Sequence, residues 1–178
     1  MLEADLYRRL ASDLRTNGKA VLADLTGPPL HAVPQGGVDL LKLSSEELLD
    51  EGFAAGDQLS EIVAGAMRLQ DAGASSVVIS RGADPAILLE QSAHPTLVEL
   101  ATPVFEPLDH RGAGDSMFAA TGVGLARGMS TRQAVRLGMA AGALNVTRRG
   151  LGTGTREEIE RLAEHVTIRS VGPARTQS

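Results

Sequence analysis

Short apolar runs alternate with stretches of helical periodicity along most of the 178 residues, and this alternation limits the possible folds more than any other feature. The clearest apolar run is Ser76–Ser80, and the longest helical pattern before it runs from Asp57 to Asp71. Strands that are apolar on both faces are typical of parallel sheets covered by helices. We therefore expect an α/β fold with a mostly parallel sheet flanked by helices.

The other elements follow the same alternation. Strands are expected at 21–25, 38–43, 76–80, 86–89 and 97–100, with the fourth as the hairpin partner of the third. Helices are expected at 3–16, 44–49, 57–71, 113–127, 131–147 and from 155 to about 166. The Thr-Gly-Pro-Pro stretch at 26–29 is interpreted as a break, and the chain after Arg169 as frayed. No linker is visible, so residues 1–170 are expected to form one domain and 171–178 a frayed tail.

Composition excludes several classes of function. Aromatic residues make up only 2% of the chain and the net charge is -5, so neither stacking platforms nor a basic surface is available for nucleic acid. The absence of cysteine removes disulfides and thiolate chemistry and fits a cytoplasmic protein. We also expect no secretion signal at the start of the sequence and no membrane-spanning segment.

The segment from Asp109 to Ala120 carries the chemistry. Gly112, Ala113 and Gly114 stand at the entry to a predicted helix, where the first-turn N–H groups have no intrahelical partners. Together with the helix dipole, these amides form an anion site suited to phosphate. Asp115 in the first turn faces the same space and can accept a proton from an attacking hydroxyl, which indicates phosphoryl transfer. A tight turn followed by an ordinary helix-start aspartate explains the same residues about equally well.

This segment resembles the C-terminal motif of the ribokinase-like (PfkB-type) carbohydrate kinases, with Ser116 and Met117 most similar to the phosphofructokinase and tagatose-phosphate kinase branch. Three other segments resemble the family pattern in the same order. Lys42–Leu48 resembles the Lys-Pro-Asn-x-x-Glu-Leu motif, Ser80–Asp84 the nucleotide loop, and Ala140–Thr147 with Gly150 the helix and loop that line the adenine pocket.

The resemblance implies an ATP-dependent kinase that phosphorylates a sugar phosphate and uses Mg²⁺. Asp115 matches the catalytic base, and Gly112, Ala113 and Gly114 match the anion hole. Glu47 matches the glutamate that organises Mg²⁺ through water. The remaining matches are nucleotide contacts: Lys42 near the phosphates, Ser80, Gly82, Asn145 and Gly150.

The sequence departs from the family pattern in two ways. Ser44 replaces the family's asparagine, Leu43 its proline, Pro85 the second glycine of the nucleotide loop, and His110 a small residue. The N-terminal part of the pattern, with its Gly-Gly motif and β lid, does not occur in this sequence. We therefore expect reduced activity and a tendency to self-associate as a homo-oligomer. A non-catalytic nucleotide-binding or interaction module is the alternative function.

Structural interpretations compete at several of these positions. Glu47 is favoured as the third residue of a capping box begun by Ser44. Taken alone, Lys42 is expected to reach solvent, and Ser80 to lie at an exit from a strand into a turn. Arg111 is expected to be a solvated loop residue rather than a ligand for the substrate's phosphate. The four histidines show no metal-ligand spacing and are interpreted as non-catalytic.

Overall fold

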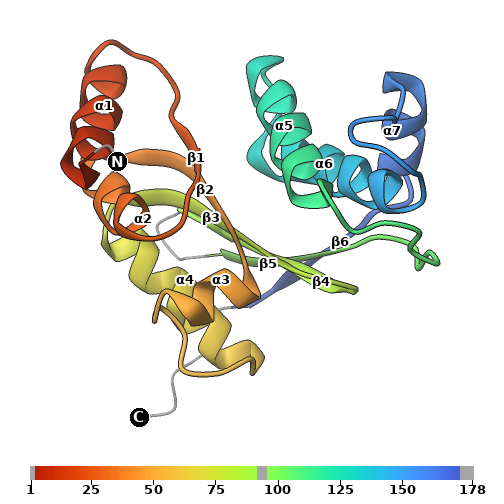
Figure 1. The fold of residues 1–178 in the computed structure, drawn as a ribbon, viewed down its shortest axis with the longest axis horizontal. Coiled ribbons are helices and arrows are strands. Elements are labelled where there is room, and N and C mark those ends of the chain that lie inside the picture. Colours follow the sequence, from red (N-terminus) through yellow and green to blue (C-terminus); the bar gives the residue numbers. More distant parts are fainter. Residues whose placement is uncertain (1–2, 92–95, 173–178) are drawn as a thin grey trace. The chain divides into compact units, whose positions relative to one another are not determined.

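The computed structural model describes residues 3–91 and 96–172 as a six-stranded sheet with helices (Figure 1). The strands lie in the order β1-β2-β3-β4-β5-β6. Their bounds are Leu22–Asp24, Val38–Ser44, Ala74–Arg81, Asp84–Glu90, Thr96–Ala101 and Thr167–Val171. The helices are α1 Ala4–Thr16, α2 Pro28–Ala32, the 3-10 helix η1 Val33–Gly36, α3 Ser45–Asp50, α4 Leu59–Asp71, α5 Ala113–Ala126, α6 Thr131–Val146 and α7 Arg156–Ala163.

The sheet is mixed rather than mostly parallel, although the predicted α/β class is confirmed. Strands β1 and β2 pair in parallel, as do β2 and β3. Strands β3 and β4 are joined by only the two residues 82 and 83. A connection that short joins antiparallel neighbours, because a parallel pair needs a crossover of a dozen residues or more.

The chain divides into two compact units, and the division passes through strands rather than through a linker. Unit 1 consists of Met1–Arg81, Ile87–Val98 and Ser170–Ser178, and unit 2 of Gly82–Ala86 and Glu99–Arg169. Because β4, β5 and β6 each contribute residues to both units, no Pro- or Gly-rich stretch marks the boundary in the sequence. The expected single domain over 1–170 therefore has two centres of packing.

Unit 1 holds the main hydrophobic core. The alternate residues Leu41 and Leu43 of β2 and Val77 and Ile79 of β3 point into it, together with apolar residues of α4. The intervening residues Leu40 and Val78 are also buried, so these strands are apolar on both faces, as the sequence predicts. This burial positions the carboxyl ends of β1, β2 and β3 at one edge of the sheet, because parallel strands end on the same side.

Two elements differ from the expectation. The stretch at 26–29 follows the end of β1, as expected of a break, but it also begins a helix that was not expected: Pro28 lies at the start of α2, where a missing N–H costs nothing, and η1 follows directly. The last helix ends at Ala163 rather than near Val166, and β6 then runs to Val171. The expected fraying after Arg169 is therefore wrong for Ser170 and Val171, while residues 173–178 lie outside the described part.

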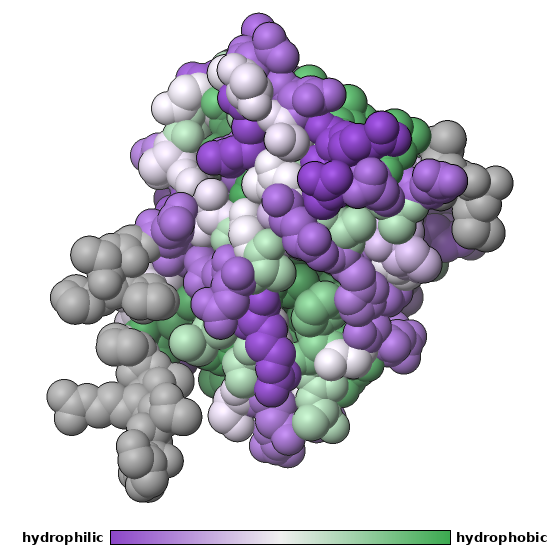
Figure 2. Space-filling model, turned by 90° about the vertical axis from the view of Figure 1, so that its left-hand side faces the viewer, coloured by the Kyte–Doolittle hydropathy of each residue, from purple (hydrophilic) through white to green (hydrophobic). Residues whose placement is uncertain are grey.

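Some large apolar side chains remain on the surface. In α1, Leu6, Leu10 and Leu14 are 37%, 53% and 37% exposed, and their spacing of four residues places them on one face of the helix. Green, apolar areas lie among hydrophilic ones on the face shown in Figure 2. Within the described ranges, no helix has both the length and the apolar character needed to cross a bilayer.

Candidate functional site

The entry to α5, in unit 2, is built on a glycine in the left-handed region. Gly112 caps the helix with φ 71° and ψ 8°, and no side chain caps the end. A side chain there would be strained, and its Cβ would lie 2.5 Å from Leu151 Cδ2. We call Gly112, Ala113, Gly114 and Asp115 the α5 mouth. The glycine of the predicted anion hole is therefore required by the backbone itself.

Two amides in the first turn of α5 are open. The amide of Ser116 donates to the carbonyl of Gly112 at 2.9 Å, and that of Ala113 makes a long 3.4 Å bond to His110. Within the described residues, the amides of Gly114 and Asp115 have no acceptor. Open first-turn N–H groups at the positive end of a helix dipole attract an anion.

Asp115 is exposed, and its carboxylate has no hydrogen-bond or ion-pair partner within residues 3–91 and 96–172. It lies in the first turn of α5 beside the open amides. A carboxylate that is neither buried nor paired is free to accept a proton from a bound hydroxyl. The arrangement therefore places open helix-end amides beside an unpaired carboxylate, which are two kinds of group that phosphoryl transfer to a hydroxyl uses.

Asp109 holds the segment that leads into the α5 mouth through hydrogen bonds from Arg111. Its carboxylate accepts a 3.0 Å bond from the amide of Arg111 and a 2.7 Å bond from the guanidinium Nη2 of Arg111. Hydrogen bonds from the Arg111 side chain and then from its amide lower the pKa of Asp109 to about 2. Arg111 is largely exposed, as expected of a solvated loop residue, although Asp109 holds its guanidinium.

Small residues let α5 and α6 pack closely side by side (Figure 1). A Cβ at Gly138 would lie 2.1 Å from Thr121 Oγ1, and one at Gly142 would lie 3.0 Å from the carbonyl oxygen of Ala113. The second contact involves the α5 mouth directly. These glycines therefore serve helix packing, which sets the position of the helix end that carries Asp115.

Two of the predicted nucleotide contacts in unit 2, Asn145 and Gly150, lie around the end of α6. Asn145 is buried, with 3% of its surface exposed, and its side chain bonds to the backbone on both sides. Gly150 is exposed with φ 98° in the segment 147–155, which we call the α6–α7 loop. Gly82 lies at the tip of the β3–β4 turn with φ 60°. Their contacts with a nucleotide stay predictions.

Arg148 braces the α6–α7 loop. Its guanidinium donates to the carbonyl of Thr153 at 3.0 Å and to Glu158 Oε1 at 2.5 Å. Glu158 also accepts the amide of Thr155 at 2.9 Å. This backbone bond and, next, the bond from Arg148 lower the pKa of Glu158 to about 2. The loop is thus held against the first turn of α7.

Lys42, in unit 1, forms an ion pair instead of reaching solvent. Its Nζ lies 2.9 Å from Asp24 Oδ2, and only 8% of its side chain is exposed. Lys42 faces Asp24 in the register of β1 and β2, at the carboxyl ends of both strands. The solvent interpretation of Lys42 is therefore wrong, and Asp24 is a charged residue that the sequence analysis did not single out. An aspartate closing a buried apolar run was the available signal.

Glu47 closes the predicted capping box. Its Oε2 accepts the amide of Ser44 at 2.6 Å, and the Ser44 hydroxyl accepts the amide of Glu47 at 3.1 Å. The capping interpretation is confirmed, and Glu47 Oε1 has no bond within the described part of the chain. No group of three metal-ligating side chains occurs there either. One free carboxylate oxygen fits Mg²⁺ that keeps its waters and binds phosphates, not a cage made by protein side chains.

Ser80 ends the parallel part of the sheet. It pairs in register with Ser44, and its hydroxyl lies 3.5 Å from the carbonyl oxygen of Leu43. Pro85 comes one residue after β4 begins, where the family's loop has a glycine. The β3–β4 connection is a tight hairpin turn, so both the strand-exit interpretation and the nucleotide-contact prediction remain compatible with the backbone.

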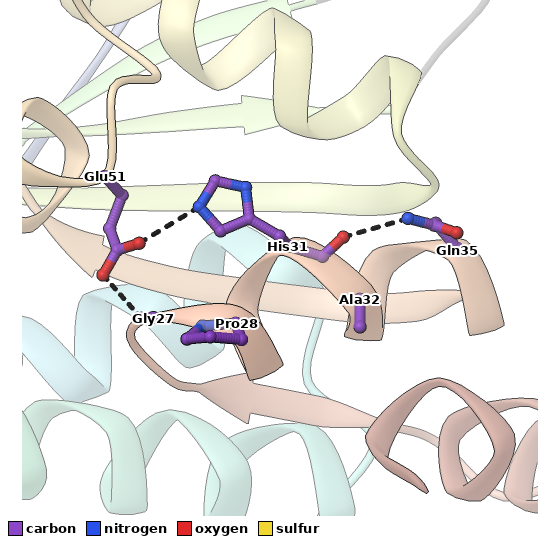
Figure 3. Close-up of a pocket in the computed structure, with 6 residues that line it drawn as sticks. All are labelled: Gly27, Pro28, His31, Ala32, Gln35 and Glu51. Atoms are coloured by element: carbon purple, nitrogen blue, oxygen red, sulfur yellow. Dashed lines mark hydrogen bonds and ion pairs between the residues drawn. The ribbon is translucent and has the colours of Figure 1, made fainter. Parts of the chain in front are cut away.

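A shallow, open pocket of about 480 Å³ lies elsewhere in unit 1 (Figure 3). Glu51 at its edge accepts the Gly27 amide at 2.5 Å through Oε1 and lies 3.1 Å from His31 Nε2 through Oε2. The His31 ring stacks on Phe53 with a centroid distance of 4.9 Å. Glu51 thus ties the end of α3 to the turn that follows β1, and no local pattern marks it in the sequence.

The comparison with known proteins identifies the family. The family model for pfkB family carbohydrate kinase matches residues 2–158. The chain belongs to the pfkB family of carbohydrate kinases. It is 36% identical over 165 residues to the ATP-dependent 6-phosphofructokinase isozyme 2 of Mycobacterium tuberculosis, and this match covers 90% of the chain and 47% of that protein. It is 26% identical over 167 residues to the 1-phosphofructokinase of Bacillus subtilis, covering 94% of the chain and 54% of the relative.

Solved structures of the family share the fold. Phosphofructokinase-2 from Escherichia coli in complex with potassium superposes with a TM-score of 0.79 at 23% identity, covering 92% of the chain and 52% of the other. The same protein has been solved with fructose-6-phosphate and in a tetrameric inhibited form. This pfkB family chain therefore has the ribokinase-like α/β fold and spans about half the length of the relatives it matches.

Proposed function

We propose that this pfkB family chain contributes to transfer of the ATP γ-phosphoryl group to a hydroxyl of a sugar phosphate, as in a phosphofructokinase. The observation that carries the proposal is the α5 mouth, where two open amides lie beside the exposed, unpaired carboxylate of Asp115. The names of the relatives support the same chemistry, because they are a 6-phosphofructokinase and a 1-phosphofructokinase. Which fructose phosphate is the acceptor is left to the assay below.

In the proposed reaction Asp115 is the catalytic base. It takes the proton of the sugar hydroxyl as that oxygen bonds to the γ-phosphorus, and the bond from the γ-phosphorus to the bridging oxygen of ADP breaks. The amides at Gly112, Ala113 and Gly114 stabilise negative charge that builds up on the transferring group. Such fixed donors act without reorganising during the reaction, so the position of the α5 mouth decides the rate.

The resemblance to the family pattern implies charge roles for Lys42 and Glu47. In this proposal Lys42 lies near the phosphates, as its resemblance to the family pattern implies, and its ammonium is ion-paired with Asp24. Glu47 has one oxygen free to accept a bond from a magnesium-bound water. When bound, Mg²⁺ neutralises phosphate charge. Ser80, Gly82, Asn145 and Gly150 stay as proposed residues of the nucleotide side.

The partners proposed are ATP, a sugar phosphate and a second copy of this chain. The apolar face of α1 formed by Leu6, Leu10 and Leu14 supports self-association, because exposed apolar stripes favour contact between copies. A tetrameric form of a family member adds to this argument.

Calorimetry and turnover test the proposal together. Binding of Mg-ATP is measured by titration, and release of ADP is measured with fructose 6-phosphate and with fructose 1-phosphate as acceptors. We expect binding, with turnover that Asp115→Asn lowers by about 10²- to 10⁴-fold at unchanged ATP affinity. Asp13→Asn, an exposed aspartate on α1, is the matched control and leaves both quantities unchanged. Turnover that survives Asp115→Asn contradicts the assignment of the base.

A non-catalytic nucleotide-binding module is the second candidate. The departures from the family pattern at Ser44 and Pro85 favour a loss of catalysis, because they lie in the segments proposed for magnesium and for the nucleotide. Binding of Mg-ATP without ADP release from either acceptor supports this candidate.

A further inference from the structure

Asn145 has a buried side chain near the end of α6 in unit 2, and its proposed contact with the nucleotide does not account for the two hydrogen bonds of that side chain. Its Nδ2 donates to the carbonyl of Arg111 at 2.7 Å, and its Oδ1 accepts the amide of Gly152 at 3.1 Å. One amide group therefore connects the segment before the α5 mouth with the α6–α7 loop. A buried amide is retained where both its ends are bonded, because an unpaired end is costly.

The hydrogen bond from Asn145 Nδ2 to the carbonyl of Arg111 affects the α5 mouth because it orients the peptide unit that leads into it. The carbonyl of Arg111 and the amide of Gly112 belong to the same peptide unit, and Gly112 then turns into the helix with φ 71°. A hydrogen bond that fixes this plane also fixes the direction in which Ala113, Gly114 and Asp115 follow. Within the described residues, the Arg111 carbonyl has no other donor.

The α6–α7 loop also approaches the α5 mouth directly, through the side chain of Leu151. Leu151 Cδ2 lies 2.5 Å from the position that a Cβ of Gly112 would take. The amides of Leu108 and Asp109 both donate to the carbonyl of Val146, the last residue of α6, at 2.8 and 3.3 Å. The end of α6 thus holds both segments, and among the described residues Asn145 alone bonds to both with its side chain.

We infer that Asn145 is a positioning residue that holds the α5 mouth and the α6–α7 loop in one arrangement. A change in the conformation of the loop is thereby transmitted to the amides of Gly114 and Asp115. Its importance for turnover rests on the proposed kinase function, whereas the mechanical link does not. Gly152 and Arg111 are exposed, so water can replace the lost bonds and the fold survives substitution. A positioning role therefore predicts a small loss of stability and a clear displacement of the mouth.

Nuclear magnetic resonance of the ligand-free chain separates the two bonds. Asn145→Ala removes both, so the Gly152 amide exchanges about tenfold faster and the Gly114 and Asp115 amide resonances shift. Asn145→Asp keeps an acceptor for Gly152 and places a repelling oxygen against the Arg111 carbonyl. It should shift the Gly114 and Asp115 resonances while Gly152 stays protected. Thr147→Val removes another hydroxyl bond at the same helix end and is expected to change none of these signals.

A loop perturbation tests transmission directly. Arg148→Gln frees the carbonyl of Thr153 and disturbs the α6–α7 loop. In the parent it should shift the Gly114 amide, and in the Asn145→Ala background that response should disappear. Folded variants in which the Gly114 and Asp115 resonances stay in place, or a response that persists without Asn145, overturn the inference.

Steady-state kinetics test whether Asn145 affects turnover. If ADP release is detected, Asn145→Asp should lower kcat by about tenfold with a smaller change in KM for ATP, because fixed donors act mainly in the transition state. Absence of turnover in the parent contradicts the proposed function and leaves the resonance experiments to decide the role of Asn145.

Discussion

Lys42 and Asp24 occupy facing positions at the carboxyl ends of two parallel strands, and their side chains form a largely buried ion pair of 2.9 Å. The pair places opposite charges at the edge of the sheet where α/β proteins commonly bind ligands. The buried ammonium of Lys42 depends on Asp24, since an isolated buried ion is expensive. The nucleotide role proposed for Lys42 therefore requires Asp24 as well.

Removing Asp24 alone should destabilise the fold more than removing the whole pair. Asp24→Leu leaves the ammonium of Lys42 buried without its partner and is expected to cost about 3 kcal/mol or more. The double variant with Lys42→Met should recover most of that loss, because two apolar side chains replace the pair. Urea unfolding measures both. Arg9→Met breaks an exposed ion pair with Asp5 and serves as the control, with a cost below about 1 kcal/mol.

The same double variant also tests function. It should fold but lose affinity for Mg-ATP, since the cation proposed for the phosphates is gone. A double variant that is no more stable than Asp24→Leu contradicts the idea that the pair acts as a unit.

Local patterns predict most elements of this chain but not how polar groups pair across it. The apolar runs of β2 and β3 and the capping residue Ser44 mark elements that the structure confirms. Strand β6 escaped prediction because its residues are mostly exposed and show no apolar alternation. Helix α2 was not predicted, because its prolines were interpreted only as the end of the preceding strand and not also as a first helical turn.

The candidate site shows the same limit. The α5 mouth is contiguous in sequence, so its glycines and Asp115 can be found from spacing alone. The partners of Lys42 and Asn145 depend on strand register and on a loop that returns to the end of α6. Such contacts join residues far apart in the chain, and a single sequence does not specify them.

Gly112→Ala should destabilise the chain through both strain and collision. A left-handed φ costs a residue with a side chain about 1–2 kcal/mol, and the new methyl group would meet Leu151 Cδ2. Gly128→Ala is the matched control, because Gly128 has φ 78° with nothing within 4 Å of a Cβ. Thermal unfolding should show a larger loss at Gly112 than at Gly128, and Leu151→Ala should reduce the difference. Equal losses would show that Leu151 does not constrain the mouth.

Glu158 should make the chain sensitive to acid. Hydrogen bonds from the Thr155 amide and from Arg148 lower its pKa in the folded state to about 2, below its ordinary value of 4.5. A depressed folded pKa means that the carboxylate stabilises the fold above pH 4.5, and this contribution is lost as the pH falls towards 2. Glu158→Gln should therefore lower the unfolding midpoint at pH 7 and have little effect near pH 2.

Carboxyl resonances followed between pH 7 and 2 check this directly. Arg148→Gln should move the titration of Glu158 only part of the way back, because the Thr155 amide is the larger cause of the shift. Glu157→Gln, on the adjacent position of the same helix, is the control for loss of a surface charge. A Glu158 resonance that titrates near 4.5 in the parent contradicts the hydrogen-bonded arrangement.

The apolar face of α1 should drive association between copies. Leu6, Leu10 and Leu14 expose apolar surface in one line, and burying it against another copy removes that surface from water. Light scattering over a range of concentrations should show a mass that rises above 18.5 kDa. Leu10→Lys places a charge in the middle of the line and should shift the distribution to monomer. Val104→Lys alters a 96% exposed side chain outside that face and should leave association unchanged. A parent chain that stays monomeric at every concentration rules out this face as a self-association surface.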